Sequence, residues 1–87
     1  MKAVVTVVGK DKTGIIAKVT GYLAEKDVNV EDISQTVLQD RFAMIMLVET
    51  GDKAIGELRT ELGALGKRTG VEISLQHEDI FSAMHRI

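Results

Sequence analysis

Hydrophobic and polar positions along the chain follow two different periods. Residues 3–8 are apolar or β-branched without interruption, and so are most of residues 42–48, which predicts two strands with both faces covered. Residues 28–38 and 71–76 instead alternate, which is typical of strands at the edge of a sheet. The apolar parity changes between Val30 and Ile33, and this change predicts a β-bulge near residues 31–32.

The remaining apolar positions recur at helical spacing. The first such segment ends near residues 26–27, and Thr13 or Asp11 is placed to cap its start. The second covers residues 54–68, with Gly70 at its C-terminal end. A short helix capped by Asp79 is expected at the end of the chain, over residues 78–87. The apolar stripes of the first two helices are Ile15, Ile16, Val19 and Leu23, and Ile55, Leu58, Leu62 and Leu65.

The predicted order is β-α-β-β-α-β followed by the terminal helix. We therefore expect one α+β domain over residues 1–87, with a ferredoxin-like βαββαβ core over residues 1–77. The strands apolar on both faces belong in the centre of an antiparallel sheet of order 4-1-3-2, and two helices cover one face. A bare second face would expose several hundred Å² of apolar surface, which is uncommon without a partner. We expect the terminal helix to cover part of that face and a second copy, in a homodimer, to cover the rest.

Composition narrows the possible functions. The 87 residues carry a net charge of −2, which argues against a duplex-binding protein. Three aromatic residues are too few for base stacking, and the absence of cysteine removes disulfides and thiolate chemistry. No apolar run is long enough for a membrane span or a signal peptide. We expect a cytoplasmic protein that binds neither nucleic acid nor membrane.

The loop over residues 9–14 is the first candidate site. It is not a nucleotide-binding loop, because Gly14 is followed by two isoleucines and not by Lys and Ser or Thr. A glycine at a helix start nevertheless lets an anion approach free N–H groups, and Asp11 can hold a cation. Such a pair of charges suits a zwitterion such as an amino acid. The alternative is that Gly14 eases a turn and Asp11 only caps the helix.

Asn29 is the second candidate, because asparagine is depleted in strands and its amide can both donate and accept. The alternative is an edge residue bonded to nearby backbone. A metal site at residues 77–79 is not expected, because successive strand residues point to opposite faces. No nucleophile with a recognisable base stands out, so we expect no catalytic residues, metal or cofactor.

Residues 5–19, which include Val-Val-Gly-Lys-Asp-Lys-Thr-Gly-Ile-Ile, resemble the opening of an ACT domain. Residues 23–33, with Asp-Val-Asn-Val-Glu-Asp-Ile, do so too, and the resemblance covers nearly all of residues 1–77. The tail over residues 77–87 resembles the ending of small stand-alone ACT-domain proteins of bacteria and archaea. Two positions depart from the family pattern: Lys12-Thr13 stands where Arg-Pro is common, and Asp27 where glycine is common.

The resemblance implies a non-catalytic regulatory module that binds an amino acid and pairs with another copy. It implies ligand contacts from the first loop, the start of the helix and the start of the second strand. The alternative function is a protein-interaction module that binds a regulatory or enzyme partner in trans without ligand. An acylphosphatase-like enzyme is disfavoured because the loop has no arginine. Carried over by position, the ligand-binding residues are Asp11, Thr13, Gly14, Ile15 and Asn29, with Val30 and Ile33.

Overall fold

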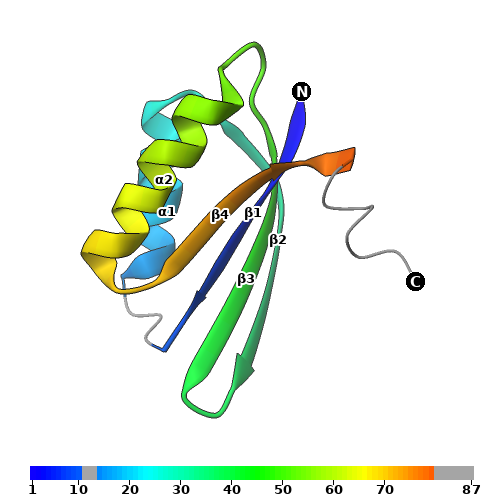
Figure 1. The fold of residues 1–87 in the computed structure, drawn as a ribbon. Helices are drawn as coiled ribbons and strands as arrows, with labels where there is room; N and C mark the ends of the chain where they lie inside the picture. The colour runs from blue at the N-terminus through cyan, green and yellow to red at the C-terminus, as the bar shows by residue number, and fades with distance from the viewer. Residues whose placement is uncertain (11–13, 80–87) are drawn as a thin grey trace.

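Four strands form one antiparallel sheet in the order β2-β3-β1-β4, and both helices lie on the same side of it (Figure 1). The computed structural model describes residues 1–10 and 14–79, except for the side chain of Leu38. The predicted βαββαβ order and the sheet order 4-1-3-2 are confirmed. The elements are β1 (Lys2–Gly9), α1 (Ile15–Glu25), β2 (Asn29–Leu38), β3 (Arg41–Glu49), α2 (Ile55–Thr69) and β4 (Glu72–His77).

The core lies between the sheet and the two helices. Alternate side chains of β1 and β3 point toward the helices and are almost completely buried, because both strands are central in the sheet. The apolar stripes of α1 and α2 pack onto them, as the helical spacing predicts. The buried core residues of the strands are Ala3, Val5, Val7, Phe42, Met44, Met46, Val48, Ile73 and Leu75. Those of the helices are Ile15, Val19, Leu23, Leu58 and Leu62.

The predicted bulge is present, as a register shift between Val30 and Asp32 in the pairing of β2 with β3. This shift places Ile33 opposite Met46, on the helix side of the sheet. Ile33 and Val37 are nevertheless 39% and 52% exposed, because β2 is the outermost strand. The alternation of β2 therefore exists, but its apolar side is only partly covered in one chain.

The ends of the helices are set by backbone geometry. Gly14, at φ 76°, is the N-cap residue of α1, so the prediction that Thr13 or Asp11 occupies this position is wrong. A left-handed residue turns the chain into the helix here, and glycine adopts that conformation without steric cost. Gly70, at φ 79°, ends α2 as predicted. Asp27, at φ 58°, turns the chain from α1 into β2 without being a glycine.

The chain is helical again at Glu78 and Asp79. The N–H of Asp79 donates to Nδ1 of His77 at 3.1 Å, so His77, and not Asp79 as predicted, caps this turn. The remainder of the predicted terminal helix, over residues 80–87, lies outside the described residues.

The sheet face opposite the helices is mostly apolar along its centre, as predicted, with Thr6 as a polar exception between Val4 and Val8. Val4 is buried there, whereas Val8 and Ile45 are 38% and 41% exposed. Ala43 and Leu47 share this face, opposite Val8 and Val4 in the register. Polar residues of the edge strands β2 and β4 flank the apolar centre: Ser34, Thr36, Ser74 and Gln76.

Candidate functional site

No side chain of residues 1–10 and 14–79 caps the N-terminal end of α1. Gly14 is exposed and has no side chain to cap the helix, and the first turn of α1 contains no acidic residue. The first N–H groups of a helix have no acceptor within the helix, and the helix dipole makes this end positive. The side chain of Ile15 is buried in the core, so this residue can offer a ligand only its main chain. Asp11 and Thr13 lie outside the described residues.

Asn29 and Val30 lie beyond the other end of α1. The N–H of Val28 donates to the carbonyl of Leu23 at 2.9 Å, which joins the end of α1 to the start of β2. Asn29 is exposed at this point, and Val30 is half-buried against the core. Ile33 follows in the middle of β2, where it faces the helix side of the sheet.

One chain therefore does not bring the candidate residues together. Gly14 and Asn29 are separated by the whole of α1, whose 11 residues rise by about 16 Å at 1.5 Å per residue. Of the described cavities, none is lined by either residue. A ligand the size of an amino acid cannot contact both positions within one chain.

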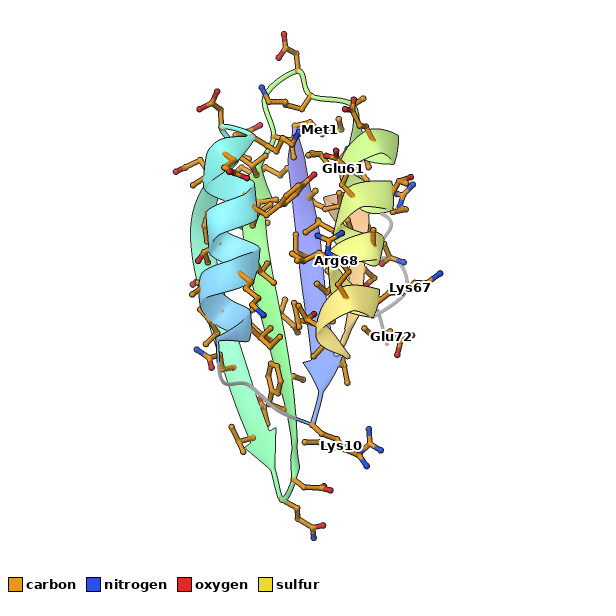
Figure 2. The ribbon with its side chains drawn as sticks, turned by 90° about the vertical axis from the view of Figure 1, so that its left-hand side faces the viewer. Met1, Lys10, Glu61, Lys67, Arg68 and Glu72 are labelled. Atoms are coloured by element: carbon orange, nitrogen blue, oxygen red, sulfur yellow. The ribbon has the colours of Figure 1, made fainter. Side chains whose placement is uncertain are left out.

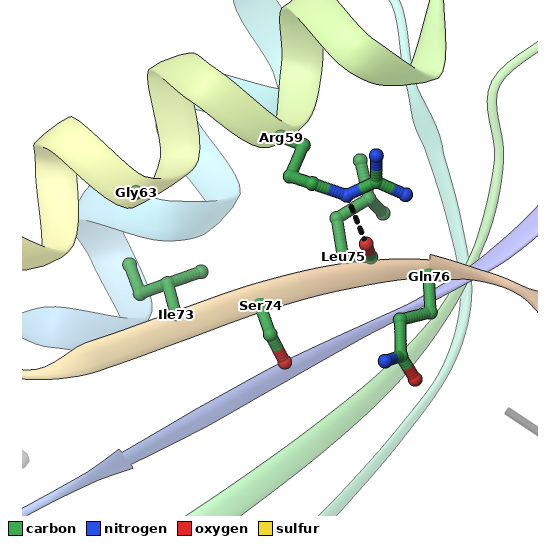
Figure 3. Close-up of a pocket in the computed structure, with 6 residues that line it drawn as sticks. All are labelled: Arg59, Gly63, Ile73, Ser74, Leu75 and Gln76. Atoms are coloured by element: carbon green, nitrogen blue, oxygen red, sulfur yellow. Dashed lines mark hydrogen bonds between the residues drawn. The ribbon is translucent and has the colours of Figure 1, made fainter. Parts of the chain in front are cut away.

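The described cavities lie elsewhere, and the sequence did not reveal them. A cavity of about 440 Å³ follows the free edge of β4 beneath Arg59 and Gly63 of α2 (Figure 3). A second, of about 400 Å³, lies where the end of β1, the start of β3 and the last turn of α2 meet. A third, of about 190 Å³, lies beside Val8 and Ala43. Each cavity is lined by residues from separate elements, so no local sequence motif predicts it.

A polar cluster joins the two helices. The hydroxyl of Tyr22 on α1 donates to Glu61 on α2, and Nζ of Lys26 lies 3.5 Å from the same carboxylate. Burial and the hydrogen bond to Glu61 raise the pKa of Tyr22. The same hydrogen bond lowers the pKa of Glu61. Both shifts favour a neutral phenol that donates to an ionised carboxylate.

A second polar cluster lies where β1 begins. The amino group of Met1 donates to Glu49, and Nζ of Lys2 lies 2.9 Å from Glu31. The hydrogen bonds from this amino group and from the N–H of Gly51 lower the pKa of Glu49. The hydrogen bond to Glu31 raises the pKa of Lys2. These contacts tie the start of β1 to the end of β3 and, across β3, to the start of β2, and none of these residues lines a described cavity.

Within residues 1–10 and 14–79, no three His, Asp or Glu side chains are grouped as metal ligands would be. Neither described helix has the length and apolar character needed to cross a bilayer.

Comparison with known proteins gives consistent similarities. The family model of the ACT domain matches residues 2–76. A UPF0237 protein of Methanopyrus kandleri is 52% identical, over 99% of this chain and 98% of its own. One of Clostridium acetobutylicum is 48% identical over the full length of both. The solved structure of an ACT domain protein from Streptococcus pneumoniae superposes with a TM-score of 0.85 at 46% identity, covering 98% of each chain.

More distant structures share only the fold. A formyltetrahydrofolate deformylase from Burkholderia mallei superposes with a TM-score of 0.77 at 19% identity. The match covers 87% of this chain but 28% of the deformylase. The fold is thus also found as one part of a longer chain.

Proposed function

Because the chain belongs to the ACT domain family, we propose that it is a non-catalytic regulatory module that binds an amino acid as a homodimer. The observation that carries the proposal is the exposed start of α1 at Gly14, which no side chain of the described residues caps, in a chain matched to the family over residues 2–76. We infer a cytoplasmic protein that binds the amino acid as a ligand and does not convert it as a substrate.

The ligand carboxylate belongs at the start of α1. Main-chain N–H groups and the positive end of the helix dipole both favour an anion at this point. The absence of acidic residues from the first turn leaves that field uncancelled. The proposal assigns the ligand ammonium to Asp11 and a contact to Thr13, both outside the described residues.

A two-fold pairing through β2 would complete the site. β2 is an edge strand, and antiparallel pairing of two copies brings the Asn29 end of one strand beside the Leu38 end of the other. The Leu38 end lies at the same end of the sheet as Gly9 and the start of α1 (Figure 1). Asn29 of one copy would then lie near Gly14 of the other, and two equivalent sites would form.

Exposed apolar side chains support this pairing. Ile33 and Val37 lie on the helix side of β2, with about two-fifths and half of their surface exposed. In the dimer, Ile33 and Val37 of each copy would be buried next to the ligand. Burial of such side chains is worth about 25 cal/mol per Å² of apolar surface, which favours association. The pairing through the open sheet face that the sequence led us to expect stays a separate prediction.

A signal follows if the dimer has two arrangements. A ligand shifts the equilibrium between them only by the difference in its affinity for each. The signal must then reach another protein, since the proposal includes no catalytic step.

A thermal-shift screen of the twenty amino acids tests this function. We expect at least one to raise the melting temperature at millimolar concentration. Asn29→Ala should abolish that rise, while Arg68→Ala, at an exposed position of α2, should keep it. No stabilisation by any amino acid, or equal effects of the two variants, would contradict the proposal.

The alternative is a protein-interaction module that works without ligand. The partly exposed Val8 and Ile45 in the centre of the open sheet face favour it, because such a surface is suited to a protein partner. Under this alternative Ile45→Ser would release a partner protein captured by the wild-type chain, and amino acids would not change the capture.

A further inference from the structure

Three cations from three separate elements line the cavity of about 400 Å³ at one end of the sheet. Lys10 follows β1, Arg41 begins β3, and Lys67 lies in the last turn of α2. Figure 2 shows Lys67 and Glu72 on the same side of the molecule, with Lys10 beyond Glu72 toward the end of the sheet. Among the described lining residues Glu72 is the one acidic side chain, so these residues carry a net charge of +2, whereas the whole chain has −2. Positive charge is thus concentrated here against the overall balance.

Helix energetics explain only part of this concentration. A cation in the last turn of α2 complements the negative end of the helix dipole, and Lys67 has that role. Lys10 and Arg41 are not on a helix, so this explanation does not apply to them. None of the three forms an ion pair within the described residues.

Two glycines in the lining of the cavity pack closely against Val71. A Cβ at Gly9 would come within 2.5 Å of the Val71 side chain, and a Cβ at Gly66 within 2.7 Å of the Val71 carbonyl oxygen. A side chain at either position would therefore force the wall of the cavity at Val71 to move.

An apolar hollow adjoins the cationic cavity. It has a volume of about 190 Å³, and its lining includes Val8, Thr36 and Ala43 of the open sheet face. Val8 and Arg41 line both cavities, so the two lie next to each other. Val8 is 38% exposed at this boundary. The pair of cavities thus offers a charged end and an apolar end to one molecule.

We propose that the two cavities together bind a small amphiphilic anion, a carboxylate or phosphate monoester with an apolar group of a few carbons. The anionic group would accept hydrogen bonds from Arg41 and Lys10, since charge-assisted bonds are the stronger ones. The apolar group would cover Val8 and Ala43. Glu72 limits the positive charge and disfavours long polyanions. This site is distinct from the amino-acid site proposed at Gly14 and Asn29.

An NMR titration of the full chain tests the proposal. The probes are pentanoate and pentyl phosphate, with inorganic phosphate and pentan-1-ol as controls that carry only the charge or only the apolar group. We expect saturating shifts of the Val8, Ala43 and Gly70 amides with at least one amphiphile. Whichever amphiphile binds identifies the anionic group. Each control should bind about tenfold more weakly or less, and binding should weaken with salt.

Variants separate this site from a general response to anions. Arg41→Gln and Lys10→Gln should each weaken binding about tenfold, with a wild-type pattern of amide signals elsewhere. Lys18→Gln, an exposed cation on α1, should leave binding unchanged. Failure of both amphiphiles to saturate, equal binding of inorganic phosphate, or an equal loss in Lys18→Gln would overturn the proposal. None of these outcomes bears on the amino-acid site, whose response is measured with Asn29→Ala.

Discussion

Nε of Arg59 donates a hydrogen bond to the main-chain carbonyl of Leu75 at 2.9 Å, and so a charged side chain covers part of the free edge of β4 (Figure 3). An open edge strand presents unpaired N–H and C=O groups that can pair with another chain, and charged side chains at the edge oppose such pairing. The other edge of the sheet, β2, has exposed isoleucine and valine instead. The two edges are therefore suited to different outcomes, association at β2 and protection at β4.

Removing Arg59 should open the β4 edge. We expect Arg59→Ala to form assemblies larger than the dimer at high protein concentration, because the Leu75 carbonyl becomes free to accept from another strand. Arg68→Ala, which removes a cation from the same helix away from this edge, should not. Light scattering over a range of concentrations measures the difference, and identical masses for both variants would contradict the protective role.

Two glycines of α2 should respond in opposite directions to the same substitution. A Cβ at Gly66 would lie 2.7 Å from the carbonyl oxygen of Val71, so Gly66→Ala should lower the free energy of unfolding by about 1–3 kcal/mol. A Cβ at Gly63 meets nothing within 4 Å. Gly63→Ala should therefore raise the free energy of unfolding by about 0.5–1 kcal/mol, because alanine has the higher helix propensity. Urea denaturation of both variants checks the pair, and a shift of the same sign in each would show that packing at Val71 is not decisive.

The turn at Asp27 should be sensitive to the shape of the side chain. Its φ of 58° is left-handed, which costs a non-glycine residue about 1–2 kcal/mol, with aspartate among the better tolerated. Asp27→Gly should keep or raise the stability, and Asp27→Val should lower it by about 1–2 kcal/mol. Thermal unfolding compares the two, and a valine variant as stable as the glycine variant would argue against this backbone requirement.

Acid should weaken the contact between the helices. Because the Tyr22 hydroxyl lowers the pKa of Glu61, the folded state favours ionised Glu61 more than the unfolded state does. This contribution is present above the ordinary glutamate pKa of about 4.3 and is lost as the pH falls below it. Glu61→Gln should thus lower the urea midpoint more at pH 7 than at pH 3. Glu25→Gln, at an exposed position of α1, should show no such pH dependence. If Glu61→Gln lowered the urea midpoint equally at both pH values, the role of ionised Glu61 would be contradicted.

The same pair should also respond to alkali. The pKa of Tyr22 is raised, so its contribution is present below the ordinary tyrosine pKa of about 10 and is lost as the pH rises through the higher folded-state value. Tyr22→Phe lacks the hydroxyl, and its stability should fall less steeply than that of the wild type above pH 10. Parallel alkaline unfolding curves would show that the phenol does not contribute in this way.

Much of the fold could be predicted because its signals are local. Uninterrupted apolar residues distinguish β1 and β3 from the alternating edge strands, and the parity change after Val30 locates the bulge. The helix caps were harder to predict from the sequence. Gly14 acts through its left-handed backbone and His77 through its Nδ1 acceptor, and hydrophobic periodicity reveals neither. The left-handed turn at Asp27 could be inferred only from the family's common glycine at this position.

The candidate ligand residues could be named from the sequence, whereas the cavities could not. The chemistry of a glycine at a helix start and of an asparagine in a strand is evident from Gly14 and Asn29 alone, and their binding roles stay a prediction. The two lie at opposite ends of α1 because Gly14 precedes this helix and Asn29 follows it. The cavity between Lys10, Arg41 and Lys67 has no sequence signal, because those residues are far apart in the chain.

Mixed dimers test the central claim, that each ligand site takes Gly14 from one copy and Asn29 from the other. Ala17→Glu places a carboxylate in the exposed first turn of α1, where it repels an anion but suits the helix dipole. Asn29→Ala removes the amide. Each variant alone should fail to bind the most stabilising amino acid of the screen.

Calorimetric titration of an equimolar mixture of these two variants is the decisive measurement. Random exchange makes half of the dimers mixed, and each mixed dimer regains one intact site of two. The account therefore predicts about a quarter of the wild-type binding capacity at wild-type affinity. A mixture that binds no more than its two components would show that each site belongs to a single chain, and would contradict the account.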